Sequence, residues 1–188
     1  MTSVTGTKRA TLAAAGLALA ALIGTAAPAL AATSTFQDAK GDVAHGVDVE
    51  SVKVVNEKNV RIAVQHADLV RTWRSGASMT VYLDTDRSQP GPEFAFPTVL
   101  YTGGDYALIK TRGDGWSYGR RAVPLQCSYE VKLDYAENVS RIRISRGCLD
   151  HPDEVRVAVK AAGTKADGRI VTDWLGGRRH LTKWVSKG

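Results

Sequence analysis

Beyond residue 31, hydrophobic and polar residues alternate with a period of two, whereas an amphipathic helix repeats about every 3.6 residues. The alternation is clearest at 47–54, 60–65 and 155–160, and each stretch is typical of a half-buried strand. Only 66–73 fits a short helix. Several short strands with turn signals between them predict an all-β fold, an antiparallel β-sandwich of the immunoglobulin-like or jelly-roll-like kind. Further strands are expected at 79–83, 94–101 and 106–110, with Pro97 at an edge or a bulge.

Two alternating runs on either side of 136–139 predict a β-hairpin whose pairing follows from the sequence. If the numbers of paired residues add up to 275, Val131 faces Ile144 on the apolar side. The same pairing places Cys127 opposite Cys148, with about 4.5 Å between Cα atoms, a separation that a disulfide can span. We therefore predict a cross-strand disulfide, which stabilises the fold by about 3 kcal/mol. Two free thiols acting as a nucleophile or as metal ligands are the alternative, and the absence of a CxxC spacing argues against it.

The first 31 residues have the order of a secretory signal peptide. Lys8 and Arg9 precede an Ala/Leu-rich run, and Ala29 and Ala31 offer the small side chains that a signal peptidase accepts. An uncleaved membrane anchor is the alternative, because the run is near the lower length limit for a membrane span, but it is rich in alanine and the Ala29-Leu30-Ala31 site favours cleavage. We therefore expect cleavage after residue 31, no membrane attachment afterwards, and a single secreted domain at 32–188.

The net charge changes this picture little. It is formally +6, and it falls to +4 once Lys8 and Arg9 leave with the signal peptide. The excess of base is spread along the chain, whereas nucleic-acid-binding proteins concentrate it in a stripe. We therefore expect no nucleic-acid partner, and we take the domain to be a monomer. The basic run at 178–183 is either a contact for an anionic envelope polymer or the solvated side of a strand.

Three carboxylates, Asp38, Asp42 and Asp48, lie close together in a loop that contains Gly41 and precedes a strand. Calcium prefers several hard oxygen ligands at flexible geometry, which such a loop supplies. A solvated loop whose aspartates cap turns is the alternative, and the spacing alone favours that alternative. A later acidic stretch around Asp86 lacks the glycine and the glutamate of an EF-hand, so we expect a proline-rich loop whose turn Asp86 caps.

Three short motifs stand out along the chain: Phe36-x-Asp38-x-x-Gly41-Asp42 before Val47-Asp48-Val49, Leu83-Asp84-Thr85-Asp86 before Pro90-Gly91-Pro92-Glu93, and Asp173-Trp174 before Trp184-Val185. Together they resemble bacterial secreted DOMON-like and family-9 carbohydrate-binding-module-like β-sandwich proteins. The resemblance implies a structural calcium ion near the first motif, with Asp38, Asp42 and Asp48 as its ligands, and it implies no catalytic residue. The sequence departs from the family pattern at Val43, where a second acidic residue often follows Asp42.

The aromatic residues supply the candidate ligand-binding side chains. Flat rings stack on the faces of sugars, but a domain with only three phenylalanines also needs tryptophan and tyrosine for packing. Trp116 and Tyr118 follow a predicted hairpin turn, so we expect them to be exposed and to bind a ligand. We expect Trp174 and Trp184 to lie in the core.

The sequence contains no HExxH motif, nucleophile elbow or phosphate-binding loop. We therefore expect a secreted, non-catalytic binding or structural module, stabilised by calcium and directed at a polysaccharide or a cell-envelope polymer. Catalytic side chains that are dispersed in the sequence can still converge in space. A small extracellular hydrolase with such a site, and a secreted inhibitor or effector of another protein, are therefore the alternatives.

Overall fold

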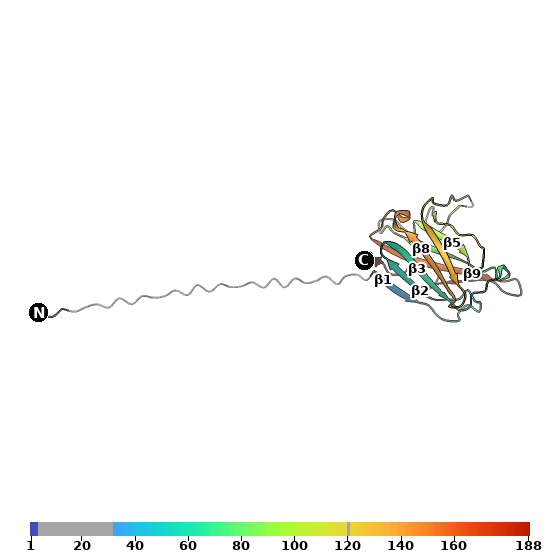
Figure 1. The fold of residues 1–188 in the computed structure, drawn as a ribbon, viewed down its shortest axis with the longest axis horizontal. Coiled ribbons are helices and arrows are strands. Elements are labelled where there is room, and N and C mark those ends of the chain that lie inside the picture. Colours follow the sequence, from blue (N-terminus) through green and yellow to red (C-terminus); the bar gives the residue numbers. More distant parts are fainter. Residues whose placement is uncertain (4–31, 120) are drawn as a thin grey trace.

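The computed structural model describes residues 1–3, 32–119 and 121–188 (Figure 1). Apart from its first three residues, the predicted signal peptide lies outside the described part of the chain. Within the described ranges, no helix is long and apolar enough to cross a membrane.

The strands build two antiparallel sheets that pack as a sandwich, so the predicted all-β fold is confirmed (Figure 1). The five-stranded sheet has the order β1 (Thr33–Gln37), β2 (Val49–Asn56), β3 (Asn59–His66), β8 (Val139–Ser145) and β7 (Tyr129–Asp134). The six-stranded sheet has the order β10 (Ile170–Trp174), β9 (Glu154–Thr164), β4 (Ser78–Asp84), β5 (Phe94–Val99) and β6 (Ile109–Lys110), and β11 (Val185–Ser186) pairs with β9. Two short 3-10 helices, η1 (Trp73–Ser75) and η2 (Arg146–Leu149), lie between strands.

Inward-facing aliphatic and aromatic side chains of both sheets form the core. On β2, Val52 and Val54 are buried while Lys53 between them is exposed, which is the alternation seen in the sequence. Val155 and Val157 repeat it on β9 of the other sheet, where they are buried on either side of the partly exposed Arg156. In Figure 1, β1, β2, β3 and β8 run side by side in one layer, and β5 and β9 belong to the other.

The hairpin of β7 and β8 forms, but the predicted pairing is wrong by two residues. Paired numbers add up to 273, so Val131 faces Ile142. A shift of two keeps every side chain on its predicted face, which is why hydrophobicity alone did not reveal it. The turn sets the pairing: Asp134 accepts hydrogen bonds from two amides of the turn, both at 3.2 Å, and Asn138 adopts a left-handed φ of 55°.

The predicted disulfide between Cys127 and Cys148 is present, with 5.8 Å between the Cα atoms. Its predicted cross-strand position is wrong, because the shifted pairing leaves Cys148 in η2, beyond the end of β8. The bond therefore ties η2 to the segment that precedes β7. A disulfide of this kind indicates an oxidising compartment.

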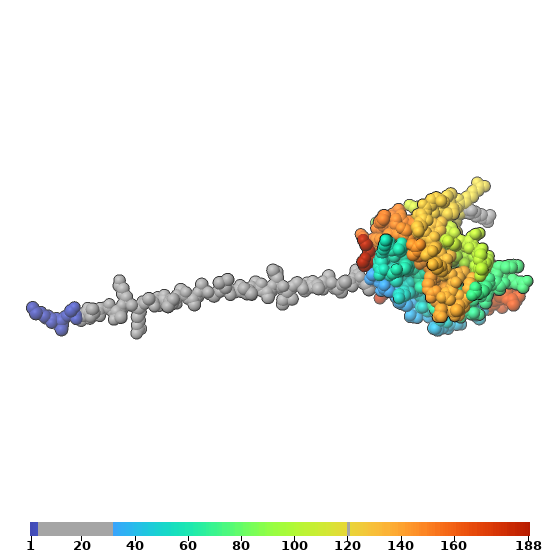
Figure 2. All heavy atoms as spheres, in the orientation of Figure 1, coloured from blue at the N-terminus to red at the C-terminus, as the bar shows by residue number. Residues whose placement is uncertain are grey.

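The helix expected at 66–73 is also wrong. β3 extends through His66, and only Trp73–Ser75 form a single 3-10 turn. Thr72 caps that turn at its start, and Gly76 ends it with a left-handed φ of 55°. A methyl group at Gly76 would lie 2.5 Å from Thr164 Oγ1, so η1 packs closely against the end of β9. Both segments project from the same end of the molecule in Figures 1 and 2.

The outer face of the six-stranded sheet carries a second, smaller apolar cluster. Tyr82 on β4 pairs with Ala95 on β5 and with Ala158 on β9, and all three are buried. Trp116 from the segment after β6, Trp174 at the end of β10 and Leu181 after it cover this row. Tyr82, Trp116, Tyr118 and Trp174 therefore gather on this covered face.

Candidate functional site

Three carboxylates from two distant segments of the chain meet at one edge of the sandwich. Oxygen atoms of Asp42, Asp48 and Asp173 lie within 4.8 Å of one another. Asp48 is buried and accepts hydrogen bonds from the amides of Gly41 at 2.8 Å and Val43 at 3.0 Å, so the loop before β2 wraps around it. Asp42 is exposed in that loop and closes the group from the solvent side.

Asp173 enters this group from β10. Its side chain is buried, and it accepts hydrogen bonds from the amides of Val49 and Trp174, both at 2.6 Å. Sequence reasoning missed this residue because it lies more than a hundred positions from Asp48. The one feature of the sequence that could have indicated Asp173 is an aspartate within a run of strand-forming residues. In the structure it pairs with the buried Ala161 of β9.

Asp38 borders the group without being one of its three members. Its Oδ1 accepts a hydrogen bond from the amide of Gly176 at 3.1 Å, and its Oδ2 is buried with no hydrogen-bond partner in the described part of the chain. We name Asp38, Asp42, Asp48 and Asp173 the acidic cluster. Two of the three predicted ligands, Asp42 and Asp48, lie in the close group, and Asp38 lies beside it.

The carboxylates of the acidic cluster are not paired with basic side chains in the described part of the chain. Among the described residues, no ion pair involves any of its four carboxylates, and the nearby Lys40 contacts Glu50 instead at 2.6 Å. The pKa of Asp42 is raised, first by its hydrogen bond to Asp48 and then by burial and by the charges of Asp48 and Asp38. Burial raises the pKa of Asp173, and the charges of Asp42 and Asp38 add to it. Carboxylate oxygens that lie close together without a basic partner can hold a metal ion, and hard oxygen ligands suit calcium.

Beside the acidic cluster, a shallow cavity opens on the outer face of the six-stranded sheet. We name this cavity of about 420 Å³ the aromatic basin, and it is lined by Tyr82, Trp116, Lys160, Thr172, Trp174, Arg178 and Arg179. The sheet supplies the floor through β4, β9 and β10, while Trp116 and the two arginines come from the covering segments.

Three aromatic rings define the shape of the basin. The rings of Tyr82 and Trp174 are stacked, with centroids 6.0 Å apart and planes 10° apart. Trp116 stands edge-on to Trp174 at 6.1 Å and 66°, and it lies 5.1 Å from the ring of Tyr82. Trp116 and Trp174 are each half-buried, so part of each ring faces solvent.

The two predicted ligand-binding residues both lie near this face. Trp116 lines the basin, whereas Tyr118 packs on its border, with its hydroxyl 3.5 Å from Thr80 Oγ1. The prediction that Trp174 lies in the core is wrong. Asp173 faces inward to its hydrogen bonds, and neighbours in a strand point to opposite faces, so Trp174 must point outward. The core prediction is also wrong for Trp184, which is half-buried, with the guanidinium group of Arg156 4.5 Å from its ring centroid.

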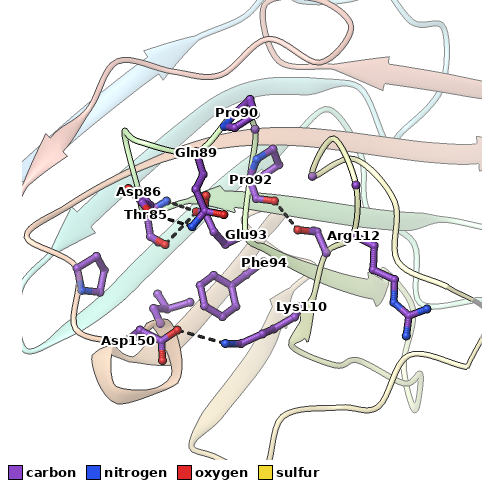
Figure 3. Close-up of a pocket in the computed structure, with 16 residues that line it drawn as sticks. Thr85, Asp86, Gln89, Pro90, Pro92, Glu93, Phe94, Lys110, Arg112 and Asp150 are labelled. Atoms are coloured by element: carbon purple, nitrogen blue, oxygen red, sulfur yellow. Dashed lines mark hydrogen bonds and ion pairs between the residues drawn. The ribbon is translucent and has the colours of Figure 1, made fainter.

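A second cavity, of about 540 Å³, lies at the start of β5 (Figure 3). Glu93 points toward Thr85, which donates its amide and its hydroxyl at 2.6 and 3.0 Å, while Lys110 reaches Asp150 at 3.3 Å. Glu93 Oε1 is buried without a partner among the described residues, and burial raises the pKa of this carboxyl. The other acids are engaged: the predicted cap of Asp86 on its own turn is confirmed by a 2.8 Å hydrogen bond from the Ser88 amide. Asp86, Glu93 and Asp150 thus line the cavity, and Asp86 and Asp150 already contact a polar or a basic neighbour.

One histidine does lie beside a serine. His66 Nε2 is 3.1 Å from Ser140 Oγ, and His66 Nδ1 is 3.2 Å from the carbonyl oxygen of Val47. The exposed fractions of His66 and Ser140 are 1% and 0%, and Ser140 also contacts Met79 Sδ at 3.7 Å. Burial lowers the pKa of His66 to about 4. The pair is part of the core, where a substrate has no access to it.

A scan against protein-family models found no match, and a search of curated proteins found no relative. The function is therefore inferred from the geometry of the acidic cluster and of the aromatic basin.

Proposed function

We propose that this chain is a secreted, non-catalytic carbohydrate-binding module whose fold is stabilised by calcium. The observation that carries the proposal is the aromatic basin, in which Trp116 and Trp174 present partly exposed rings above Tyr82. Sugar rings offer flat C–H faces that stack on aromatic side chains. Hydroxyl and cationic donors around the rings, such as Thr172 and Lys160, suit the oxygens at the rim of a sugar.

The rings are held in place before any ligand arrives. Tyr82 and Trp174 are fixed by the pairing of β4 with β9 and of β9 with β10. Trp116 follows a turn in which Gly113 and Gly115 adopt left-handed φ values of 63° and 80°, and Asp114 accepts a hydrogen bond from the Trp116 amide at 3.2 Å. Rings held in this way lose little conformational entropy on binding, which favours affinity.

Calcium is the metal that best fits the acidic cluster. The acidic cluster offers only oxygen ligands, the carboxylates of Asp42, Asp48 and Asp173 among them, and calcium prefers oxygen ligands. The buried, unpartnered Oδ2 of Asp38 adds a further negative oxygen beside them. Several carboxylates without a neighbouring cation destabilise a fold through mutual repulsion, and a divalent ion removes that cost. This supports calcium as a structural ion, with Asp173 added to the ligands that the sequence suggested.

Secretion is supported by two independent features. The first is the order of charged, apolar and small residues in 1–31. The second is the disulfide between Cys127 and Cys148, which is stable in oxidising compartments and rare in the cytosol. Both features suit a protein that meets polysaccharides outside the cell.

The proposal is tested by affinity electrophoresis through gels that contain neutral or acidic polysaccharides from plant and bacterial cell walls. We expect at least one polymer to retard the protein, and the Trp116→Ala and Trp174→Ala variants to migrate freely. Trp73→Ala is the matched control, because Trp73 is 70% exposed in η1 and does not line the basin. Free migration of the unmodified protein in every gel, or unchanged retardation of both basin variants, contradicts the proposal.

A further inference from the structure

The aromatic basin carries more positive charge than stacking on a neutral sugar requires. Lys160 projects from β9, and Arg178 and Arg179 project from the turn after β10. Within the described residues, Lys160 and Arg178 form no ion pair with a carboxylate. Arg179 contacts Asp114 at 3.3 Å, but both side chains are about half exposed, so this contact is weak and easily exchanged.

The cations are also placed against the rings. The ammonium group of Lys160 lies 5.8 Å from the ring centroid of Trp174, and the guanidinium group of Arg179 lies 5.7 Å from that of Trp116. A ligand stacked on either ring therefore brings its substituents within reach of a cation. Guanidinium groups bind carboxylates through two parallel hydrogen bonds, which favours planar anionic substituents.

The turn that carries the arginines is held in an uncommon conformation. Gly176 and Gly177 adopt φ values of 64° and 112°, and Arg179 itself adopts a left-handed φ of 59°. A left-handed residue other than glycine costs about 1 kcal/mol, so the surrounding structure must stabilise it. Asp38 accepts the Gly176 amide at 3.1 Å, and the amide of Gly177 donates to the carbonyl of Trp174 at 3.1 Å. These contacts hold the backbone of the turn, which places both arginines at the basin.

We infer that the aromatic basin binds a polysaccharide whose sugars carry carboxylate groups. This inference rests on the proposed function and names the class of its ligand. The rings of Trp116 and Trp174 select a pyranose, while Lys160, Arg178 and Arg179 select its negative charge. A polymer of glycerol phosphate supplies the charge but has no sugar ring to stack, so the combination of rings and cations favours a polyuronate.

The test is calorimetric titration of the protein, in calcium-containing buffer, with tetramers of galacturonate, glucuronate and mannuronate. Each acid is compared with its methyl ester, which has the same rings without the charge. We expect at least one acid to bind, its ester to bind about tenfold more weakly or worse, and the affinity to fall with added salt. A glycerol phosphate oligomer is expected to bind more weakly than the acid.

Two variants test whether the cations of the basin cause the preference for the acid over its ester. Lys160→Gln and Arg178→Gln are expected to lower the affinity for the acid by about tenfold while leaving the weak binding of the ester unchanged. Lys132→Gln is the matched control, because Lys132 is exposed on β7 of the other sheet. Thermal unfolding of each variant checks that the fold is retained.

The outcomes separate this inference from the proposed function. If acid and ester bind equally well, or if neither Lys160→Gln nor Arg178→Gln lowers the affinity for the acid, the inference of an anionic ligand in the basin is overturned. The proposed carbohydrate-binding module then still stands. Tighter binding of the glycerol phosphate oligomer overturns the requirement for a sugar ring. Binding of none of the acids, together with retardation by a neutral polysaccharide in the gels, overturns the inference alone. The absence of retardation in every gel removes the proposed function as well.

Discussion

Acidification from pH 7.5 to pH 4 is expected to weaken the fold through His66, a residue outside both proposed sites. The ring is 1% exposed, and burial lowers its pKa from 6.5 to about 4, against the smaller raising effects of its contact with Val47 and of the charge of Asp48. In the neutral ring, Nδ1–H donates to the carbonyl of Val47 and Nε2 accepts the hydroxyl proton of Ser140. Protonation places a second N–H against that hydroxyl and a positive charge in the core.

The direction of the stability change follows from the pKa of His66 in the unfolded chain, 6.5, and in the folded chain, about 4. Between pH 6.5 and about 4 the unfolded chain binds a proton at this position and the folded chain does not, so stability falls as the pH falls. Each factor of ten in proton affinity is worth about 1.36 kcal/mol, so the loss approaches about 3 kcal/mol by pH 4. Burial raises the pKa values of Asp84 and Glu93, and these groups act in the opposite direction. The effect of His66 must therefore be isolated by comparison with a variant.

His66→Gln provides that comparison, because its amide retains hydrogen-bonding capacity without titrating. Urea unfolding of both proteins is measured in steps from pH 7.5 to pH 4 at constant ionic strength, in calcium-free buffer. We expect the variant to be less stable at pH 7.5, and the difference between the two proteins to shrink by about 3 kcal/mol on reaching pH 4. A difference that stays constant across this range refutes the argument that burial keeps His66 neutral.

Three other predictions concern the acidic cluster, the disulfide and the backbone. Calcium at a hundredfold excess over its Kd is expected to stabilise the protein by about 2.7 kcal/mol in thermal unfolding. Asp173→Asn should lose most of that gain yet be at least as stable as the unmodified protein in a chelator; an unchanged gain excludes Asp173 as a ligand. Replacing Cys127 and Cys148 by serine should lower the free energy of unfolding by about 3 kcal/mol in urea, and an unchanged midpoint would count against this role. Gly115→Ala should cost more than Gly103→Ala in the same assay, because only the first methyl group meets backbone atoms, at 2.6 Å, although both glycines have a positive φ; equal costs would show that φ alone matters.

Local patterns in the sequence predicted the strands and the disulfide. The alternation at 47–54 and 155–160 became β2 and β9, because period two directly reflects the two faces of a strand. The bond between Cys127 and Cys148 needed only their number and an oxidising compartment. The pairing of β7 with β8 was missed because the turn, through the side chain of Asp134, fixes a shift that the hydrophobic pattern cannot distinguish.

The candidate site was less accessible from the sequence, because its parts come from distant segments. Asp42 and Asp48 were recognisable in one loop, whereas Asp173 joins them only through the contact between β2 and β10 at the Val49 amide. Trp174 was assigned to the core because large aromatic residues usually pack there. The inward position of Asp173 reverses that assignment, since successive side chains of β10 must alternate between faces.

The central claim is that a polysaccharide binds over Trp116 and Trp174, and the four tryptophans of the chain test it directly. Each indole N–H gives its own signal in a nitrogen–proton correlation spectrum of the calcium-loaded protein. The spectrum is recorded while an oligosaccharide that binds in the titration experiments is added stepwise. We expect the Trp116 and Trp174 signals to shift in a saturable way, while those of Trp73 and Trp184, which do not line the basin, stay in place. Unmoved Trp116 and Trp174 signals at saturation, or shifts confined to Trp73 or Trp184, contradict the claim.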